Sequence, residues 1–198
     1  IFSFDFTGAK RGVLPASYDY LRLEGRMQYR LNLPPIGYSQ LMLEGGKIFG
    51  KVPYLLLKLH EGNGTYFYDR YAFSCMNFYE FSSDAWISFF YEHHFNGFLL
   101  GRVPLLKKLN WREVFVFKGV YGTLSARNDG SLPNTKAVML FPVGMSSVEH
   151  PYLETGFGIE NIFRLLRVDC IWRLTHHRAV PGLSIPTFTV NFSLNLKF

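Results

Sequence analysis

The chain has 198 residues, of which 48% are hydrophobic and 18% aromatic, and its formal net charge is +6. The mean hydropathy is only +0.04. No apolar run approaches the ~18 residues of a transmembrane helix, which excludes a helical membrane protein. The basic residues form no Lys/Arg block and no nucleic-acid-binding motif, so we expect no nucleic-acid partner.

Alternating apolar and polar residues begin at Phe2, in IFSFDFTG, and recur in YDYLRLEGRMQYRLNL and LRVDCIWRL. This period of two is the pattern of a β-strand with one apolar face and one polar face. The alternation is weaker in the middle of the chain, and in WREVFVFKGVYGTL both faces are partly apolar. Segments such as NLPP and FSSD favour turns between strands. The pattern predicts about nine strands, at residues 1–7, 18–32, 36–48, 66–81, 85–95, 111–124, 152–164, 166–175 and 187–198.

Two of the connections between these strands have similar sequences. FGKVPYLLLKLHEG (49–62) and LGRVPLLKKLNW (100–111) share G-[KR]-V-P followed by Leu and Lys, 51 residues apart. With the predicted strands, this spacing places both copies on the same rim of a barrel. Each copy is either a short amphipathic turn in the lipid headgroup zone or an ordinary Leu-rich connector, and the sequence leaves both interpretations open.

The stretch ARNDGSLPNTKAVMLFPVGMSSVEHP, residues 126–151, interrupts the alternation and is rich in Gly, Pro, Asn and Ser. We expect a long irregular loop here, which on a barrel would be extracellular.

The last twelve residues, TFTVNFSLNLKF, alternate polar and apolar without exception. Strands of soluble proteins usually run about 5–6 residues, whereas a tilted strand that crosses a bilayer needs about 9–11. The length therefore favours a strand whose apolar face contacts lipid.

The polar faces of the strands carry charges of both signs, which suits pairing inside a barrel. A soluble antiparallel sheet would expose such a face to solvent, but too little of the chain remains to cover the apolar faces. We therefore predict an all-β fold that forms part of an antiparallel transmembrane β-barrel. In an open pore the excess arginine would favour anions; in a plugged pore, the interpretation that we prefer, the same residues are structural. The predicted lumen-facing charged residues are Arg22, Glu24, Arg26, Arg30, Glu154, Glu160, Arg167, Asp169 and Arg173.

No motif indicates catalysis. Cys75 and Cys170 are far apart and show no metal-ligand spacing. His93 and His94 point to opposite faces if they lie on a strand, and GFGIEN lacks the third glycine of a dinucleotide fingerprint. We therefore predict no enzyme activity, no catalytic residue, no cofactor and no metal site.

Three long stretches carry a resemblance to a known family: GKIFGKVPYLLLKLHEGNGTYFYDRYAF (46–73), YEHHFNGFLLGRVPLLKKLNWREV (91–114) and GIENIFRLLRVDCIWRL (158–174). In them the chain resembles the C-terminal barrel region of a large family of Bacteroidota outer-membrane proteins of uncharacterised function. The N-terminal part of those proteins often carries a carboxypeptidase-like regulatory β-sandwich domain. The resemblance implies a bacterial outer-membrane location and a longer parent protein. We thus expect residues 1–198 to be the C-terminal part of one β-barrel domain, with upstream strands and any periplasmic domain missing from this sequence.

A more distant likeness is to the BamA/TamA outer-membrane assembly superfamily, in which a Gly-rich penultimate region leads to a final strand ending in Phe. ETGFGIENIFRLLRVDCIW and FSLNLKF are similar to these elements. Barrels of that superfamily have sixteen strands, so about nine strands would be roughly its C-terminal half. Its Arg-Gly-aromatic lumen loop is absent in the expected form, which argues against an insertase role.

The C-terminus also matches a signal that such outer-membrane proteins carry, an aromatic last residue preceded by apolar residues at alternate positions. Phe192, Leu194, Leu196 and Phe198 fit it. The resemblance thus implies the barrel-assembly machinery as a partner during biogenesis, and outer-membrane lipid afterwards.

These observations favour a non-enzymatic transport or assembly (translocation) barrel. The alternatives are a passive channel or receptor, a membrane anchor for a periplasmic β-sandwich domain and, most distantly, a soluble aromatic-rich β protein.

Overall fold

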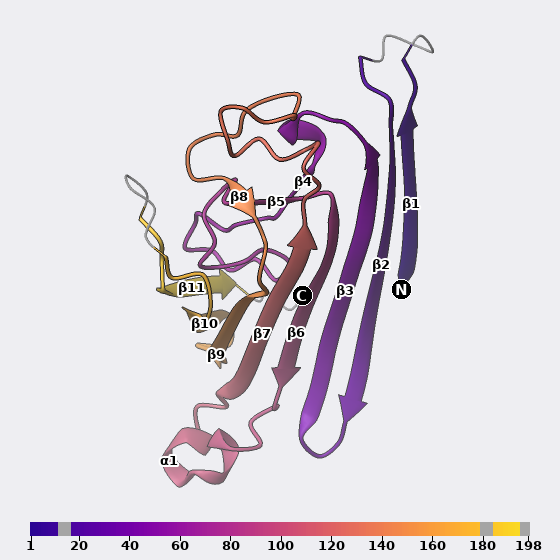
Figure 1. The fold of residues 1–198 in the computed structure, drawn as a ribbon. Helices are drawn as coiled ribbons and strands as arrows, with labels where there is room; N and C mark the ends of the chain where they lie inside the picture. The colour runs from indigo at the N-terminus through magenta and orange to yellow at the C-terminus, as the bar shows by residue number, and fades with distance from the viewer. Residues whose placement is uncertain (12–16, 179–183, 195–198) are drawn as a thin grey trace.

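The computed structural model describes residues 1–11, 17–178 and 184–194. They form an eight-stranded sheet in the order β1-β2-β3-β6-β7-β9-β10-β11 (Figure 1), in which every neighbouring pair is antiparallel. Its strands are β1 (Phe2–Ala9), β2 (Tyr20–Leu33), β3 (Gly37–Gly50), β6 (Ala85–His94), β7 (Arg112–Thr123), β9 (Tyr152–Ile162), β10 (Leu166–Arg173) and β11 (Phe188–Leu194). The prediction of an all-β, antiparallel fold is confirmed.

The remaining elements are short. Three small strands form a separate sheet, β4 (Lys58–Leu59), β5 (Phe81–Ser83) and β8 (Ser146–Ser147). The helical turns are η1 (Tyr54–Leu56), η2 (Leu100–Arg102) and α1 (Pro104–Lys107). None of the helices in the described residues has the length and apolarity needed to cross a membrane.

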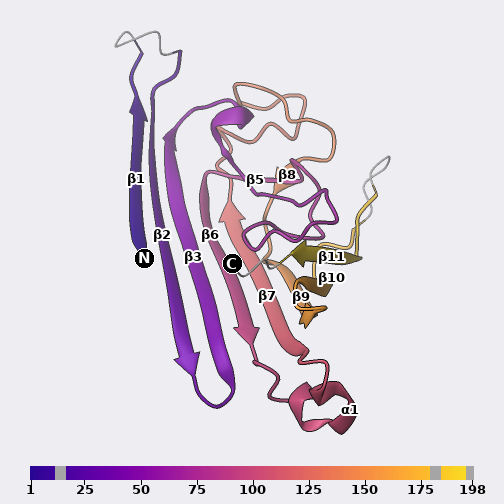
Figure 2. The same cartoon turned by 180° about the vertical axis from the view of Figure 1, so that it is seen from behind.

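The large sheet is strongly coiled, and residues 51–84, which we call the inner segment, fill its concave side. Figures 1 and 2 show β9, β10 and β11 crossing the direction of β1, β2 and β3, with the inner segment between the two groups. We call the sheet face toward the inner segment the inner face and the opposite one the outer face. Among the described residues β1 and β11 are the two edge strands of the sheet. The inner segment forms backbone hydrogen bonds with β11: Tyr68 N donates to Phe192 O, and Phe192 N donates to Tyr66 O, each at 2.7 Å.

The predicted strand at residues 66–81 is wrong, so the large sheet has eight strands where about nine were predicted. Apart from the isolated bridges Gly62↔Phe73 and Phe67↔Phe192, this stretch pairs with no strand before β5 begins. The stretch is rich in aromatic and apolar residues, and residues 72–76 are buried without a break, because it packs against the inner face. Phe73, Met76 and Phe81 join the buried core there. The apolar composition therefore reflects burial and not strand pairing.

The predicted shared rim of the two G-[KR]-V-P copies is also wrong. The first copy follows β3 and the second follows β6, its antiparallel neighbour, with Tyr38 opposite His94. Without the strand predicted at 66–81, no strand of the large sheet lies between β3 and β6 in the chain, so the copies lie at opposite ends of that sheet. In the first copy, Val52 and Leu57 are buried near Trp86, the role of an ordinary Leu-rich connector.

Residues 124–151 form the expected long irregular loop, interrupted only by β8. It is tied to the inner segment by polar contacts: the side chain of Asn128 donates to Asp84 Oδ2 at 3.1 Å and accepts from Val52 N at 3.1 Å. The loop therefore closes over one end of the concave side.

Candidate functional site

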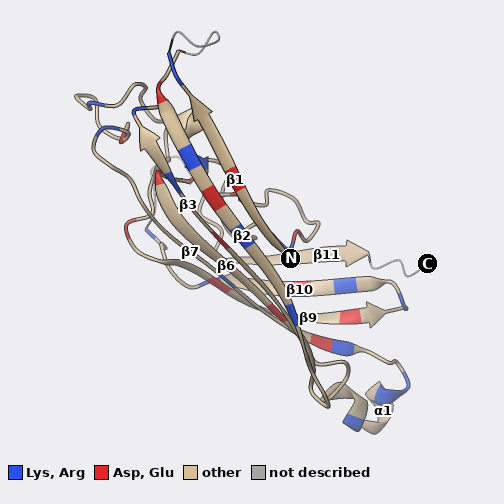
Figure 3. Ribbon diagram, turned by 90° about the vertical axis from the view of Figure 1, so that its right-hand side faces the viewer, with Lys and Arg blue, Asp and Glu red and all other residues tan. Residues whose placement is uncertain are grey.

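The nine predicted lumen-facing charged residues all lie on the inner face. They occupy alternate positions of β2, β9 and β10, where Glu154 and Asp169 are fully buried. Figure 3 shows charges of both signs along β2 and β10 and acidic residues on β9. The structure brings eight of the nine into three groups of polar contacts with the inner segment and its neighbours, and it leaves Arg30 apart at one end of the sheet.

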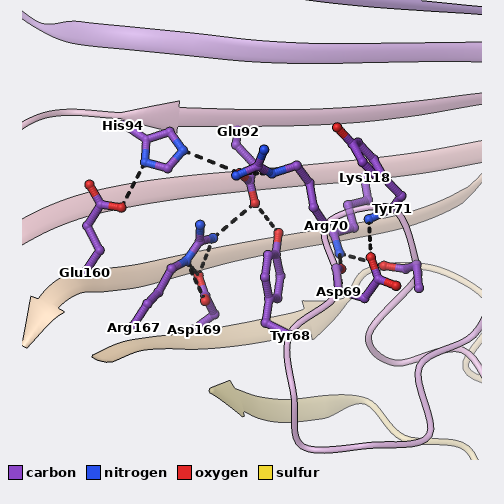
Figure 4. Close-up of polar contacts among 11 residues, drawn as sticks. Tyr68, Asp69, Arg70, Tyr71, Glu92, His94, Lys118, Glu160, Arg167 and Asp169 are labelled. Carbon is purple, nitrogen blue, oxygen red and sulfur yellow. Dashed lines mark hydrogen bonds and ion pairs between the residues drawn. The ribbon is translucent and has the colours of Figure 1, made fainter. Parts of the chain in front are cut away.

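The first group surrounds the carboxylate of Glu92 on β6, which is only 2% exposed. Arg70 Nε of the inner segment lies 2.8 Å from one of its oxygens, and Arg167 Nη2 of β10 lies 3.1 Å from the other. His94 bridges Glu92 and Glu160, with ring nitrogens 3.4 and 3.1 Å from their oxygens. Figure 4 shows these side chains converging from three strands and the inner segment. A buried carboxylate is tolerated only with such partners.

Tyr68 of the inner segment reaches the same carboxylate and donates its hydroxyl hydrogen to Glu92. Burial and the adjacent charge of Glu92 raise the pKa of Tyr68, so the hydroxyl remains protonated and remains a donor. Arg167 and Lys118 each lie 4.5 Å from the centroid of the Tyr68 ring, a favourable cation–π distance. Arg167 is also held by Asp169, at 2.7 Å from its Nε. Tyr68 therefore fixes the inner segment to β6, β7 and β10 together.

The second group holds the backbone of the inner segment directly. Lys118 Nζ donates to Asp69 O at 2.9 Å and to Ala72 O at 2.6 Å. The Glu154 carboxylate accepts from Ser74 N at 2.8 Å and Cys75 N at 2.7 Å. Here the backbone N–H and C=O groups of the inner segment have no neighbouring strand as a hydrogen-bond partner. Side chains of β7 and β9 bond these groups instead.

In the same region Arg173 Nη2 lies 2.5 Å from Glu80 Oε1, and Arg173 Nη1 donates to Cys75 O at 3.2 Å. The guanidinium also lies 4.8 Å from the Tyr152 ring centroid. Arg173 therefore secures the last part of the inner segment, next to β5.

The third group lies near β2 and β3. Lys58 Nζ of the inner segment is 2.5 Å from Glu44 and 3.8 Å from Glu24. Arg26 and Arg22 complete the group, at 2.5 Å from Glu44 and 2.6 Å from Glu24. Two cations and two carboxylates of the sheet thus surround one lysine of the inner segment.

His60 and Ser83 form a buried polar pair, with Nε2 and Oγ 2.9 Å apart. Burial, with Lys58 nearby, lowers the pKa of His60 to about 3, so its ring is neutral at ordinary pH. Their exposed fractions are 3% and 0%. The hydrogen bond between them links two parts of the inner segment.

The two cysteines are separate and free. Cys75 is buried in the inner segment, and burial raises the pKa of its thiol to about 12. Cys170 lies half-buried at an outward position of β10. No group of three or more His, Cys, Asp and Glu side chains suited to a metal ion occurs in the described part of the chain.

A sequence profile described as "Family of unknown function (DUF5686) C-terminal domain" matches residues 1–126. The chain belongs to this family. No curated protein matches the sequence.

The match to the DUF5686 C-terminal domain confirms that the chain is a member of an uncharacterised family. It covers β1 to β7 and the whole inner segment, and so includes Glu92, Tyr68 and Lys118. The Bacteroidota origin, the carboxypeptidase-like domain, and the likeness to BamA/TamA stay predictions.

Several site residues escaped the sequence analysis. Glu44, Glu92 and Lys118 each directly follow an apolar or aromatic run of a strand, LML, FFY and FVF, and a charge in that position was a usable signal. Tyr68 and Arg70 lie in the stretch misassigned as a strand, so nothing local indicated that they fold inward.

The predicted C-terminal signal is only partly described. Phe192 and Leu194 are on β11, are 40% and 59% exposed, and point to the outer face. Leu196 and Phe198 lie outside the described residues.

Proposed function

We propose that this chain forms the C-terminal part of a transmembrane β-barrel in a bacterial outer membrane, whose lumen is filled by the inner segment. The observation that carries the proposal is the apolar outer face. Phe4, Ile87, Phe157 and Trp172, from four different strands, are 63%, 55%, 59% and 41% exposed. A large exposed apolar surface marks a site of contact with another protein or with a membrane. We infer that membrane hydrocarbon contacts this one.

Polar residues on the outer face support this interpretation because they gather near the strand ends. Lys47 lies beside the first residue of β6, and Glu113 is the second residue of β7. Ser39 and His93 share the opposite end from Lys47 and bond to each other at 2.8 Å. Ser39 and Lys47 are eight residues apart, or about 27 Å along a strand. At a tilt of about 40° that is roughly 20 Å along the membrane normal, close to the apolar band of such barrels.

The connection lengths suggest an orientation. At one end, residues 34–36 and 163–165 form short turns, and only the connection 95–111, which carries η2 and α1, is long. At the other end every connection is long: 10–19, 51–84, 124–151 and 174–187. Outer-membrane barrels have short periplasmic turns and longer extracellular loops. We therefore place the short turns in the periplasm and the loop at 124–151 outside.

Within this architecture we favour a non-enzymatic transport or translocation function. A barrel that only anchors another domain needs no polar interior, whereas a transport barrel needs a polar path once its plug moves. The charged inner face and the polar anchors of the inner segment suit such a path. A passive channel or receptor is the second candidate, because Arg30, at one mouth of the interior, remains free of the polar groups that hold the inner segment.

The test is electrophoresis of the full-length protein, purified in detergent and run with and without boiling. A closed barrel resists SDS until heated, so we expect two different mobilities. Identical mobility, together with solubility in the absence of detergent, would overturn the proposal and leave a soluble aromatic-rich sheet protein.

A further inference from the structure

A polar cavity of about 690 Å³ opens at the short-turn end of the sheet. Its wall includes Pro34 of the turn after β2, Arg164 of the turn after β9, and His94 at the end of β6. The volume lies in the range that holds small organic ligands in other proteins. The cavity is therefore large enough for a solute and not only for water.

Four arginines line this cavity: Arg30, Arg70, Arg112 and Arg164. Arg70 is neutralised by Glu92. The other three form no ion pair with any carboxylate in the described part of the chain. Three unpaired guanidinium groups around one cavity create a positive potential that attracts anions.

The carboxylate nearest these arginines is already engaged elsewhere. Glu160 is the cross-strand neighbour of Arg112, yet its carboxylate lies 3.1 Å from His94 Nδ1 and forms no ion pair with Arg112. Because His94 also contacts Glu92, both carboxylates are tied into the interior. The arginines at the mouth are consequently surplus to the salt bridges that hold the inner segment.

Tyr38 gives the cavity a rigid wall. Its ring stacks on His94, with centroids 4.4 Å apart and planes at 11°, and the Arg30 guanidinium lies 4.0 Å from its centroid. The aromatic ring thus holds Arg30 in place without neutralising it, because a cation–π contact leaves the guanidinium charged and its N–H groups free.

We propose that this cavity binds a small solute that carries two or more phosphate or carboxylate groups. Guanidinium groups match both kinds of oxyanion with paired N–H donors, and three of them favour a multiply charged ligand over chloride. The inference deepens the proposed function and rests on it, since it names the class of solute that meets the periplasmic mouth. Binding itself requires only the cavity and not the membrane.

The test is calorimetric titration of pyrophosphate into the full-length protein in detergent, at constant ionic strength. We expect saturable binding that Arg112→Gln and Arg164→Gln each weaken about tenfold, since each removes one charged hydrogen-bonding partner. Citrate in a parallel titration distinguishes the chemistry: binding of either probe supports the proposal, and their ratio shows whether phosphate or carboxylate is preferred.

Arg127→Gln is the matched control, because it removes the same charge from an exposed position of the loop at the other end of the sheet. We expect it to leave the affinity unchanged. Absence of saturable binding up to millimolar pyrophosphate and citrate would overturn the proposal, as would equal weakening by Arg127→Gln. The boiled and unboiled gel of each variant reports the barrel separately, so failure of the anion site and failure of the membrane proposal are distinguishable.

Discussion

The outer and inner faces of the large sheet differ in both polarity and burial. The outer face exposes Phe4, Ile87 and Phe157, while the inner face buries Glu92, Lys118 and Glu154. A soluble sheet usually covers its apolar side and leaves its polar side in water. Here the polar side is covered by the inner segment, and among the described residues nothing covers the apolar side. The difference supports the proposal that hydrocarbon covers the outer face and that the inner face lines a polar interior.

The inner face should show the largest effect when one of its charges is removed. Glu92→Gln leaves Arg70 and Arg167 without their shared carboxylate, and loss of one partner of a buried ion pair costs about 3–5 kcal/mol of unfolding free energy. Denaturant unfolding of the protein folded in detergent or lipid measures it. Glu149→Gln, at an exposed carboxylate, is the control and should change little. Equal stability of the two variants would show that the buried network does not hold the fold.

The outer face should respond to charge according to its position. Phe157 lies in the middle of β9 and packs against Phe115, with ring centroids 5.2 Å apart. If lipid covers it, Phe157→Lys should cost about 2–4 kcal/mol, as at the midplane of a barrel. Phe163→Lys, in the turn between β9 and β10, is the matched substitution and should be nearly neutral. Equal, small effects in a lipid-refolding equilibrium would argue for a solvated outer face.

His60 should make the inner segment sensitive to acid. Its folded pKa of about 3 lies below its usual value of 6.5. Below pH 6.5 the unfolded chain therefore binds a proton that the folded protein does not, and stability falls as pH falls toward 3. At pH 5 the loss is about 2 kcal/mol. Unfolding of the wild type and of His60→Gln between pH 7 and 5 measures it. The variant should lose this part of the pH slope, and an unchanged slope would contradict the assignment.

Local sequence predicted the strands because successive side chains of a strand point to opposite faces, so that residues two positions apart share a face. Arg22, Glu24 and Arg26 share a face for this reason, whatever they contact. The same argument placed Arg167, Asp169 and Arg173 together on β10, and both sets lie on the inner face. Their partners were not predictable, because Lys58 and Glu80 come from the inner segment, which contributes no strand to the large sheet.

The error at residues 66–81 shows where local patterns fail. The stretch is rich in aromatic residues, as strands often are, yet its backbone is held by Lys118 and Glu154 from strands far along the chain. Such a composition reports only that the segment is buried. It does not tell a strand partner from a set of charged side chains that bond the same backbone groups.

The sequence by itself determined the β-class of this protein, the apolar and polar faces of its strands, and the lack of any helix able to span a membrane. Those properties follow from short-range periodicity and composition. Only the tertiary structure decided which face is covered, that the inner segment fills the concave side, and that three arginines at one mouth form no ion pair with any described residue. These depend on contacts between residues tens of positions apart, whose geometry no local pattern specifies.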